Sequence, residues 1–178
     1  TFEGSKHAIK RAFDIVVSSL ALLAIGLATP FIALAIYIDS PGPVFFRQLR
    51  VGRDGETFRM VKFRSMKTTA EQDLAALKAQ SDGNGVLFKM KNDPRISRVG
   101  RILRKFSIDE LPQFFNVLIG DMSIVGPRPP LPTEVTAYNG EVFRRLYINP
   151  GITGLWQVSG RSDLSWDESV RLDLRYVE

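Results

Sequence analysis

The stretch IVVSSLALLAIGLATPFIALAIYI, residues 15–38, contains no charged side chain and decides how the rest of the chain is interpreted. At about 1.5 Å per residue, a straight helix of this length would reach about 36 Å, which exceeds the roughly 30 Å hydrocarbon core of a bilayer. A tilted transmembrane helix is therefore the simplest interpretation. A signal peptide fits less well, because the apolar run is too long for one.

Pro30 and the flanking charges favour a different path. A proline inside a helix removes one backbone hydrogen bond and clashes with the preceding turn, so a break is expected at Thr29-Pro30. The hydroxyls of Ser18, Ser19 and Thr29 offer partners for backbone groups in lipid. Basic residues flank the run on both sides, and basic flanks favour the cytoplasmic face. Two alternatives remain open: a kinked spanning helix, and a re-entrant helix–break–helix hairpin that enters and leaves on one face.

The composition excludes several kinds of chemistry. The chain has no cysteine and one histidine, His7, so disulfides and thiolate catalysis are excluded and a Ser-His-Asp triad or a zinc site is not expected. Catalysis would depend on carboxylates, basic side chains, hydroxyls or a hard cation, and oxygen ligands alone indicate Mg²⁺. The net charge of +5 suits an anionic partner. No nucleic-acid-binding motif is present, so a basic nucleic-acid binder is only the third hypothesis.

The pattern beyond Pro41 predicts a small α+β domain that is mainly helical and carries one short β-hairpin around Asp54-Gly55. Helices are expected from about Thr68 to Ala79, over residues 96–106 and 111–119, and after Ser165-Trp-Asp-Glu168, which fits a capping box. The last of these helices would lie on the membrane interface or pack on the core. Residues 81–85, 126–132 and 150–154 are predicted to be loops.

The predicted organisation is a membrane segment over residues 1–39 and a cytosolic domain over residues 40–178. The first residue is Thr1 rather than methionine, and the chain ends within a helical pattern. We therefore expect it to be a fragment of a longer protein.

The stretch SIDELPQFFN, residues 107–116, places Asp109 and Glu110 side by side after a basic segment. One interpretation is a helix cap, because Ser107-x-x-Glu110 fits a capping box and Pro112 belongs in a first turn, so that a helix would start near Ile108. The other is chemical. A helix start keeps Asp109 ionised and accommodates a phosphate, and an ionised carboxylate can attack phosphorus. A Mg²⁺ ion at Asp109 would remove the repulsion between carboxylate and diphosphate.

Arg128 is the second candidate for phosphate chemistry. A guanidinium matches the geometry of phosphate, and Pro127 and Pro129 stiffen the backbone on either side. The alternative is a proline-rich turn or a partner-binding segment.

Three long segments resemble the signature motifs of the bacterial sugar transferase family, the monotopic polyprenyl-phosphate phosphoglycosyl transferases. They are KFRSM (62–66), NDPRISRVGRILRKFSIDELPQFFNVLIGDMSIVGPRP (92–129) and PGITGLWQVSGR (150–161), and the resemblance begins at KRAFDIV (10–16). It implies an enzyme that transfers a sugar-1-phosphate from a UDP-sugar to undecaprenyl phosphate and starts the synthesis of a bacterial capsule or exopolysaccharide. The course implied is ping-pong: Asp109 attacks the sugar-bearing phosphate, UMP leaves, and the polyprenyl phosphate then takes the phosphosugar.

The resemblance also assigns residues. Asp109 would be the nucleophile and hold Mg²⁺, and Glu110 would orient the pair or assist in positioning protons and metal. Arg128 would bind phosphate as part of Gly-Pro-Arg-Pro. Further substrate contacts would come from the other motifs, at Lys62, Arg64, Asp93, Arg95, Gln157 and Arg161. Lys62, Arg64 and Asp93 also fit ordinary surface or turn positions, and Trp156 would shape the donor pocket or anchor in the membrane interface.

The resemblance implies that the apolar helix is re-entrant at Thr29-Pro30, on the cytoplasmic face of the bacterial inner membrane, in contact with membrane lipid. The segment at 150–161 indicates a glucose or galactose donor. The rival hypothesis is a membrane-tethered scaffold without enzymatic activity, which would bind anionic lipid or a protein partner. Whether two copies pair into a homodimer is left open.

Overall fold

A computed structural model describes residues 4–77, 92–159 and 164–178. Contacts group the chain into two compact units. Unit 1 comprises Thr1–Ala24, Arg47–Val61 and Gln113–Glu178, and unit 2 comprises Ile25–Phe46 and Lys62–Pro112. This grouping divides the first helix, whereas the predicted boundary at residue 39 concerns what lies in the membrane and stays a prediction.

The first helix, α1, runs over Gly4–Asp39 with Pro30 inside it. The helix is thus continuous through the predicted break, and its path relative to a membrane stays a prediction. Two hydroxyls bond back onto the helix as expected, because Thr29 Oγ1 donates to the Ile25 carbonyl and Ser19 Oγ to the Ile15 carbonyl, each at 2.7 Å. Such bonds give backbone carbonyls a second partner where water is absent.

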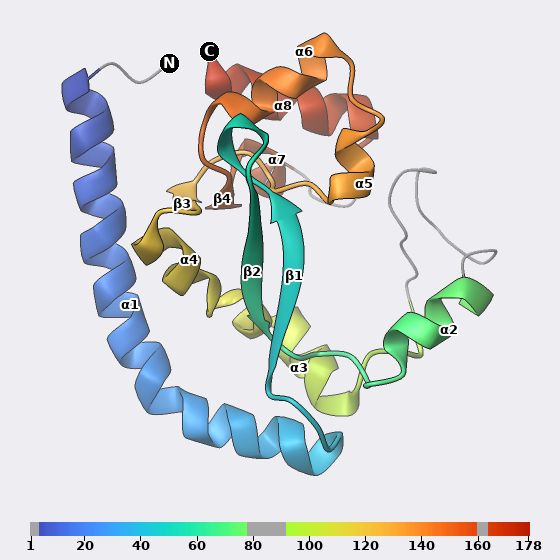
Figure 1. Cartoon of the computed structure of the whole chain (residues 1–178). Coiled ribbons are helices and arrows are strands. Elements are labelled where there is room, and N and C mark those ends of the chain that lie inside the picture. The colour runs from blue at the N-terminus through green and yellow to red at the C-terminus, as the bar shows by residue number, and fades with distance from the viewer. Residues whose placement is uncertain (1–3, 78–91, 160–163) are drawn as a thin grey trace. The chain divides into compact units, whose positions relative to one another are not determined.

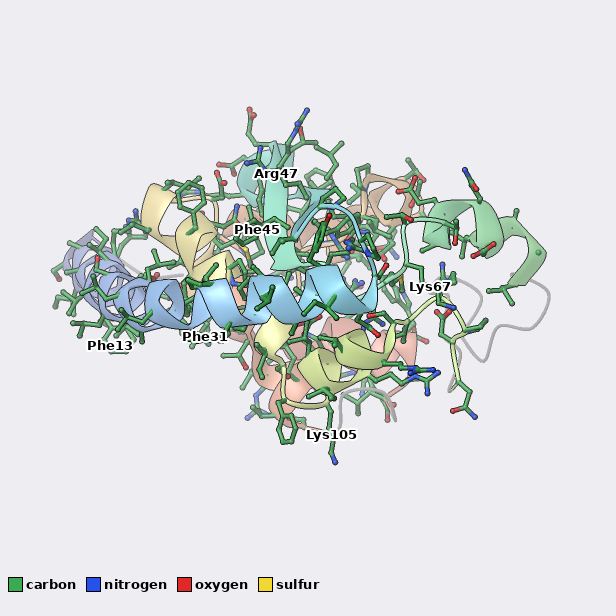
Figure 2. All side chains as sticks on the ribbon, turned by 90° about the horizontal axis from the view of Figure 1, so that it is seen from below. Phe13, Phe31, Phe45, Arg47, Lys67 and Lys105 are labelled. Atoms are coloured by element: carbon green, nitrogen blue, oxygen red, sulfur yellow. The ribbon has the colours of Figure 1, made fainter. Side chains whose placement is uncertain are left out.

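The apolar side chains of α1 are largely exposed. Leu20, Leu23, Leu27 and Phe31 are between 63% and 79% exposed, and Figure 2 shows the side chain of Phe31 on the helix. By length and composition, α1 is the one helix of the described chain that suits a membrane. An exposed apolar surface of this size is unfavourable in water and favourable in lipid.

The predicted hairpin is confirmed. Strands β1 (Phe45–Val51) and β2 (Thr57–Phe63) form a two-stranded sheet and are joined through the turn η1 (Arg53–Gly55). Asp54 and Gly55 both have positive φ, at 56° and 83°, which is why Asp-Gly is favoured there. The predicted class, α+β and mainly helical with one short hairpin, therefore holds (Figure 1).

The core of unit 1 joins the hairpin to the helix α4 (Gln113–Ile119). Phe58 and Met60 of β2 pack with Val117 and Met122, and Ile124 and Ile152 cover them. Asn116 adds a polar link: its side-chain oxygen accepts from the Val61 N–H at 3.0 Å, and its side-chain nitrogen donates to the Arg59 carbonyl at 2.9 Å. The amide thus satisfies backbone groups of β2 that would otherwise be buried without partners.

The first turns of α1 are fastened to unit 1 by charged side chains. Asp14 accepts from Ser123 Oγ at 2.7 Å and from the Ile124 N–H at 3.2 Å. Arg11 donates to the Val117 and Leu118 carbonyls at 2.6 and 2.7 Å, which are among the last carbonyls of α4. A cation at a helix C-terminus is favourable, so the segment KRAFDIV has a structural role here.

The prediction that residues 150–154 form a loop is wrong. Gly151–Thr153 is the strand β4, and it pairs in parallel with β3 (Ser123–Val125) in the register Ser123↔Gly151. A Cβ at Gly151 would lie 2.1 Å from the Gly126 nitrogen, so glycine is required by close backbone contact rather than by a turn.

Unit 2 has its own core around the second half of α1. Ile36, Phe63 and Leu103 are buried together, and Leu103 belongs to α3 (Arg98–Lys105). Asp39, at the end of α1, accepts from the Val99 N–H at 2.9 Å, and Ser97 Oγ accepts from the Gly100 N–H at 2.9 Å. These two acceptors satisfy free N–H groups at the start of α3, and the bond to Asp39 ties α3 to α1.

The helix predicted from about Thr68 is α2 (Ala70–Leu77), and the predictions for residues 78–79 and 81–85 lie outside the described residues. The remaining elements of unit 1 are short, except for the last helix. They are α5 (Pro132–Val135), α6 (Gly140–Phe143), η4 (Arg144–Tyr147), α7 (Leu155–Val158) and α8 (Trp166–Val177). The capping box of α8 is confirmed, and α8 buries Val170, Leu174 and Val177 within unit 1. Packing thus accounts for its apolar side chains.

Candidate active site

The acidic pair lies in a turn. Ser107 adopts the left-handed conformation, with φ 56° and ψ 25°, and its side chain caps nothing. A 3-10 turn, η3, follows over Ile108–Glu110, and α4 begins only at Gln113. The predicted capping box at Ser107 is therefore wrong. A helical turn does begin at Ile108 as predicted, but it is the 3-10 turn η3, and the α-helix starts only at Gln113. A non-glycine residue in this conformation carries strain, which is frequent at functional sites.

The physical reason is the helix that precedes Ser107. The helix α3 runs to Lys105, and the Ser107 N–H donates to the Arg104 carbonyl at 3.2 Å. Ser107 therefore ends one helix and cannot hold the extended backbone that an N-cap needs. The chain turns sharply there and presents Asp109 and Glu110.

Asp109 is buried, at 7% exposure, and its carboxylate has no hydrogen-bond partner among the described residues. No side chain among the described residues forms a hydrogen bond or an ion pair with it. Some side-chain oxygen and nitrogen atoms of the described residues are both closed off from solvent and without a hydrogen-bond partner, but the Asp109 oxygens are not among them. The carboxylate can therefore be reached from solvent. A carboxylate that is shielded by protein, without a hydrogen-bond partner, and still reachable is suited to bind a cation or to act as a nucleophile.

Arg104 is a positive charge that interacts electrostatically with Asp109. Its Nε donates to Ser65 Oγ at 2.8 Å. Burial lowers the pKa of Arg104, and the charge of Asp109, followed by that of Asp93 and with a smaller effect of Glu110, raises it. Arg104 lies within the helix predicted over residues 96–106 and was not among the predicted site residues. The signal was its position in the basic segment that directly precedes the acidic pair.

Glu110 and Lys62 form the second part of the site. Lys62 Nζ lies 3.7 Å from Glu110 Oε1, and their side chains are 22% and 42% exposed. The structure therefore brings together two residues that come from distant motifs. Lys62 is the last residue but one of β2, and its charge offsets that of Glu110 while both remain accessible from water.

Asp93 and Arg95 pair with each other. Arg95 donates from Nε and Nη2 to the Asp93 carboxylate at 2.6–3.1 Å, and both are buried. The hydrogen bond from the Arg95 side chain holds the pKa of Asp93 below its usual range, against the opposing effect of burial. The pair lies in unit 2, and Asp93 acts on Arg104 electrostatically. Asp93 therefore influences the acidic pair indirectly, through its electrostatic interaction with Arg104.

Arg64 fastens the backbone that follows α1. Its guanidinium donates to Ser40 Oγ at 2.9 Å, to the Pro43 carbonyl at 2.5 Å, to the Met66 carbonyl at 3.2 Å and to the Ser40 carbonyl. These bonds occupy most of its five donors. A direct substrate contact by Arg64 stays a prediction, and the bonds give it a structural role.

Arg128 lies in unit 1, whereas the acidic pair lies in unit 2. Its Nη1 donates to Glu134 Oε2 at 2.9 Å and its Nη2 to Oε1 at 3.4 Å. Its side chain is 22% exposed, whereas that of Glu134 is 2% exposed. Glu134 thus holds one edge of the guanidinium from the protein side and leaves N–H groups for an anion.

The other predicted contacts of unit 1 lie around α7. Gln157 Nε2 donates to the Ile152 carbonyl at 3.1 Å, while Gln157 Oε1 and Trp156 Nε1 are buried without a hydrogen-bond partner. Such atoms usually have a partner, so a bound molecule or water would account for them. Arg161 lies outside the described residues.

A metal site made by the protein alone is not found among the described residues, because they contain no group of three or more acidic, histidine or cysteine side chains that could hold an ion. Mg²⁺ commonly binds through one or two carboxylates and completes its shell with substrate phosphates and water. Asp109 fits this kind of Mg²⁺ site, because its carboxylate has no hydrogen-bond partner among the described residues and Glu110 lies next to it in the chain.

Comparison with known families identifies the class. Residues 5–178 match the profile of the family described as bacterial sugar transferase. The match covers the hairpin, the acidic pair and the Gly-Pro-Arg-Pro segment. The chain belongs to this family.

The similar proteins carry names from polysaccharide synthesis. The chain is 49% identical over 169 residues to galactosyl transferase CpsE of Streptococcus agalactiae, covering 94% of this chain and 37% of that protein. It is 45% identical over 180 residues to undecaprenyl-phosphate galactose phosphotransferase of Salmonella typhimurium, covering 98% and 37%. It is 43% identical over 187 residues to UDP-glucose:undecaprenyl-phosphate glucose-1-phosphate transferase of Escherichia coli, again covering 98% and 37%. The chain thus spans 37% of the length of these relatives.

Proposed function

We propose that the chain is the catalytic part of a membrane phosphoglycosyl transferase. It would transfer hexose-1-phosphate, with glucose or galactose as the hexose, from a UDP-sugar to undecaprenyl phosphate and release UMP. Family membership and the names of the three relatives support this class of reaction. The structural observation that carries it is Asp109, a buried and reachable carboxylate with no hydrogen-bond partner among the described residues.

The proposed reaction has two displacements at one phosphorus atom. A carboxylate oxygen of Asp109 attacks the phosphorus that bears the sugar, the bond to the bridging oxygen breaks, and that oxygen leaves with UMP. A phosphate oxygen of undecaprenyl phosphate then attacks the same phosphorus, and the bond to Asp109 breaks, which returns the carboxylate. No proton has to be gained or lost overall by Asp109, so the chain needs no histidine for this chemistry.

The basic side chains of unit 2 would neutralise the charge that the donor brings. Arg104 acts electrostatically on Asp109 and Glu110, and Lys62 pairs with Glu110. We propose that Lys62 moves between Glu110 and a donor phosphate, since a flexible ammonium group can change partners at little cost. Glu110 would hold Lys62 in reach of the donor before the donor binds.

Mg²⁺ would be held by Asp109, with Glu110 beside it. When bound, the ion supplies positive charge that lets a carboxylate and a diphosphate approach each other. Arg128 is proposed as a phosphate ligand, because its guanidinium is braced by Glu134 and keeps free donors.

We also propose that α1 is re-entrant and that the catalytic part lies at the cytoplasmic face of the inner membrane. Support comes from its exposed apolar side chains, the Pro30 within it, and the basic residues on both sides. Because the chain lacks cysteine, a single cysteine placed at Ser5 can be labelled from either side of sealed cells. Labelling only from outside would exclude the re-entrant path.

The first test of the reaction is a search for the covalent intermediate. Protein in detergent is incubated with UDP-hexose and Mg²⁺ but without acceptor, and its intact mass is measured. We expect a gain equal to one hexose phosphate that maps to Asp109 and disappears on addition of undecaprenyl phosphate. A non-enzymatic scaffold would show no adduct and no UMP release with any nucleotide sugar.

A further inference from the structure

A cleft of about 1090 Å³ lies in unit 2, where the end of α1 meets the start of α3 (Figure 1). Residues of α1, of the segment after β2 and of α3 line it, among them Ala35, Ile38, Asp39, Lys67, Arg98 and Arg101. Its volume is at the upper end of the roughly 300–1,000 Å³ that is usual for sites of small molecules. The cleft therefore has room for a head group together with the first part of a lipid chain.

The cleft has an excess of positive charge. Lys67, Arg98 and Arg101 are exposed, and within the described ranges none of these side chains forms a hydrogen bond or an ion pair. Asp39 is the one acidic residue among the described lining residues, and its carboxylate accepts from the Val99 N–H at 2.9 Å. Three cations and one carboxylate leave two positive charges in excess, which suits an anion.

The side of the cleft that belongs to α1 is apolar. Ile38 lines the cleft and is 71% exposed. Leu34 and Phe31, four and seven residues before Ile38, are 59% and 77% exposed. This spacing places the three side chains in one stripe along the helix. A hydrocarbon chain that leaves the cleft along α1 would therefore stay in contact with apolar side chains.

The helix α3 connects the cleft with the acidic pair. Arg98, Arg101 and Arg104 follow one another at intervals of three residues, so each is a neighbour of the next on the helix surface. Arg98 and Arg101 line the cleft, and Arg104 lies in the last turn of α3. The turn η3, which carries Asp109, contacts α3. The three arginines thus form a row that begins at the cleft and ends at the turn of α3 before the acidic pair.

We infer that this cleft is the entry site of the lipid acceptor, where Lys67, Arg98 and Arg101 bind the phosphate and the apolar stripe of α1 receives the chain. The inference rests on the proposed function, and it adds a place where the acceptor is held before its phosphate reaches Asp109. A phosphate monoester carries a charge of about −1.5 to −2 at neutral pH, which matches the excess of two positive charges. The phosphodiester of an ordinary phospholipid carries a single negative charge and matches it less well.

The test compares Arg101→Gln with Lys105→Gln, which remove one charge each from the same helix. Lys105 is exposed and is not among the described residues that line the cleft. We expect Arg101→Gln to raise KM for undecaprenyl phosphate by about tenfold, the value of one lost hydrogen bond to a charged group, and to change KM for UDP-hexose less than about twofold. Lys105→Gln should leave both KM values within about twofold, because a distant exposed charge is screened by salt. An acceptor KM that is the same for Arg101→Gln and the wild type would overturn the inference.

A binding measurement distinguishes the acceptor from other lipids. Undecaprenyl phosphate, undecaprenol and phosphatidylglycerol are titrated separately onto the wild-type protein and onto Arg101→Gln in neutral detergent. We expect the wild type to bind undecaprenyl phosphate about tenfold more tightly than either of the other two, and Arg101→Gln to lose this preference. Equal binding of phosphatidylglycerol would overturn the inference, because the cleft would then hold a resident phospholipid. Equal binding of undecaprenol would also overturn it, since the cations would contribute nothing.

A conservative variant guards against a merely structural effect. Arg101→Lys keeps the charge, and an ammonium group also binds phosphate, so we expect this variant to recover most of the binding that Arg101→Gln loses. Failure to recover it would overturn the role of charge at this position. If the wild type forms no hexose-phosphate adduct from UDP-hexose, the proposed function itself fails. If undecaprenyl phosphate at a low concentration removes the adduct from Arg101→Gln as fast as from the wild type, only the entry site fails.

Discussion

Two segments of this chain share one pattern and fold differently. Ser107-Ile-Asp-Glu110 and Ser165-Trp-Asp-Glu168 both read as capping boxes. Ser165 is extended, at φ −65° and ψ 164°, and its hydroxyl accepts from the Glu168 N–H while Glu168 bonds back to the Ser165 N–H. Ser107 is left-handed and caps nothing. The difference shows that a capping box needs a free extended residue before the helix, which the end of α3 denies to Ser107.

The two segments also differ in what they do with their acidic residues. Glu168 completes the capping box of its own helix, and Asp167 is exposed in the first turn of α8. Asp109 is buried with no hydrogen-bond partner among the described residues, and Glu110 pairs with Lys62 from another motif. The same residue types therefore serve local stability in one place and candidate chemistry in the other.

The largest contrast should appear when each central aspartate loses its charge. We expect Asp109→Asn to lower UMP release by about 10³-fold or more, because an amide cannot replace the carboxylate nucleophile. Asp167→Asn should leave the rate within about twofold. Both are measured as UMP formed from UDP-hexose, Mg²⁺ and undecaprenyl phosphate. Equal release by Asp109→Asn and the wild type would show that the nucleophile has been assigned wrongly.

The next contrast concerns the two glutamates. Glu110→Gln removes the partner of Lys62 and a group beside the nucleophile, so we expect kcat to fall by about 10²-fold. Glu168→Gln changes a group whose hydrogen bonds, among the described residues, go to Ser165, and it should not affect kcat. The same assay with saturating donor separates them, and similar rates for the two variants would contradict the site described for Glu110.

The conformation of Ser107 makes its own prediction. A β-branched residue is strained in the left-handed region, so Ser107→Val should lower the free energy of unfolding by about 1–2 kcal/mol, while Ser107→Gly should be close to neutral. Thermal unfolding in detergent measures both. If valine were tolerated better than glycine, the left-handed assignment would have to be abandoned.

A smaller effect is expected when each serine loses its hydroxyl. Ser165→Ala removes a true N-cap and should cost about 1 kcal/mol, or about 2–4 °C in Tm for a chain of this size. Ser107→Ala removes no capping hydrogen bond and should leave Tm nearly unchanged. Comparable losses at both positions would mean that Ser107 caps a helix in solution.

The smallest expected effect is a pH dependence of thermal stability that arises from Glu168 in the segment Ser165-Trp-Asp-Glu168. The Ser165 backbone N–H, and then its hydroxyl, hold the pKa of Glu168 below its ordinary value. A folded-state pKa below the unfolded value gives stability that is present above about pH 4.3 and is lost as the pH falls through the folded value. The Tm gap between the wild type and Glu168→Gln should therefore narrow below about pH 4. A gap that widens on acidification would contradict this sign.

Much of the candidate site was predictable from residue types and order. Asp109, Glu110, Lys62 and Arg128 stand out because phosphate chemistry in a chain without cysteine needs carboxylates and cations. Arg104 was missed, since a basic residue on a helix is usually a solvated one. The parallel pair β3–β4 was missed as well, because Pro150-Gly-Ile-Thr-Gly154 has the composition of a turn and its glycines are needed for close contact.

The sequence by itself determined the local features: the apolar helix, the hairpin at Asp54-Gly55, the cap at Ser165 and the residue types of the acidic pair. These follow from interactions within a few residues, so neighbours along the chain are enough to specify them. The tertiary structure alone decided that Ser107 turns rather than caps, that Lys62 meets Glu110, and that Arg145 of η4 pairs with Asp173 of α8. Those outcomes depend on which helix ends next to which turn, and only packing between segments far apart in the chain determines that.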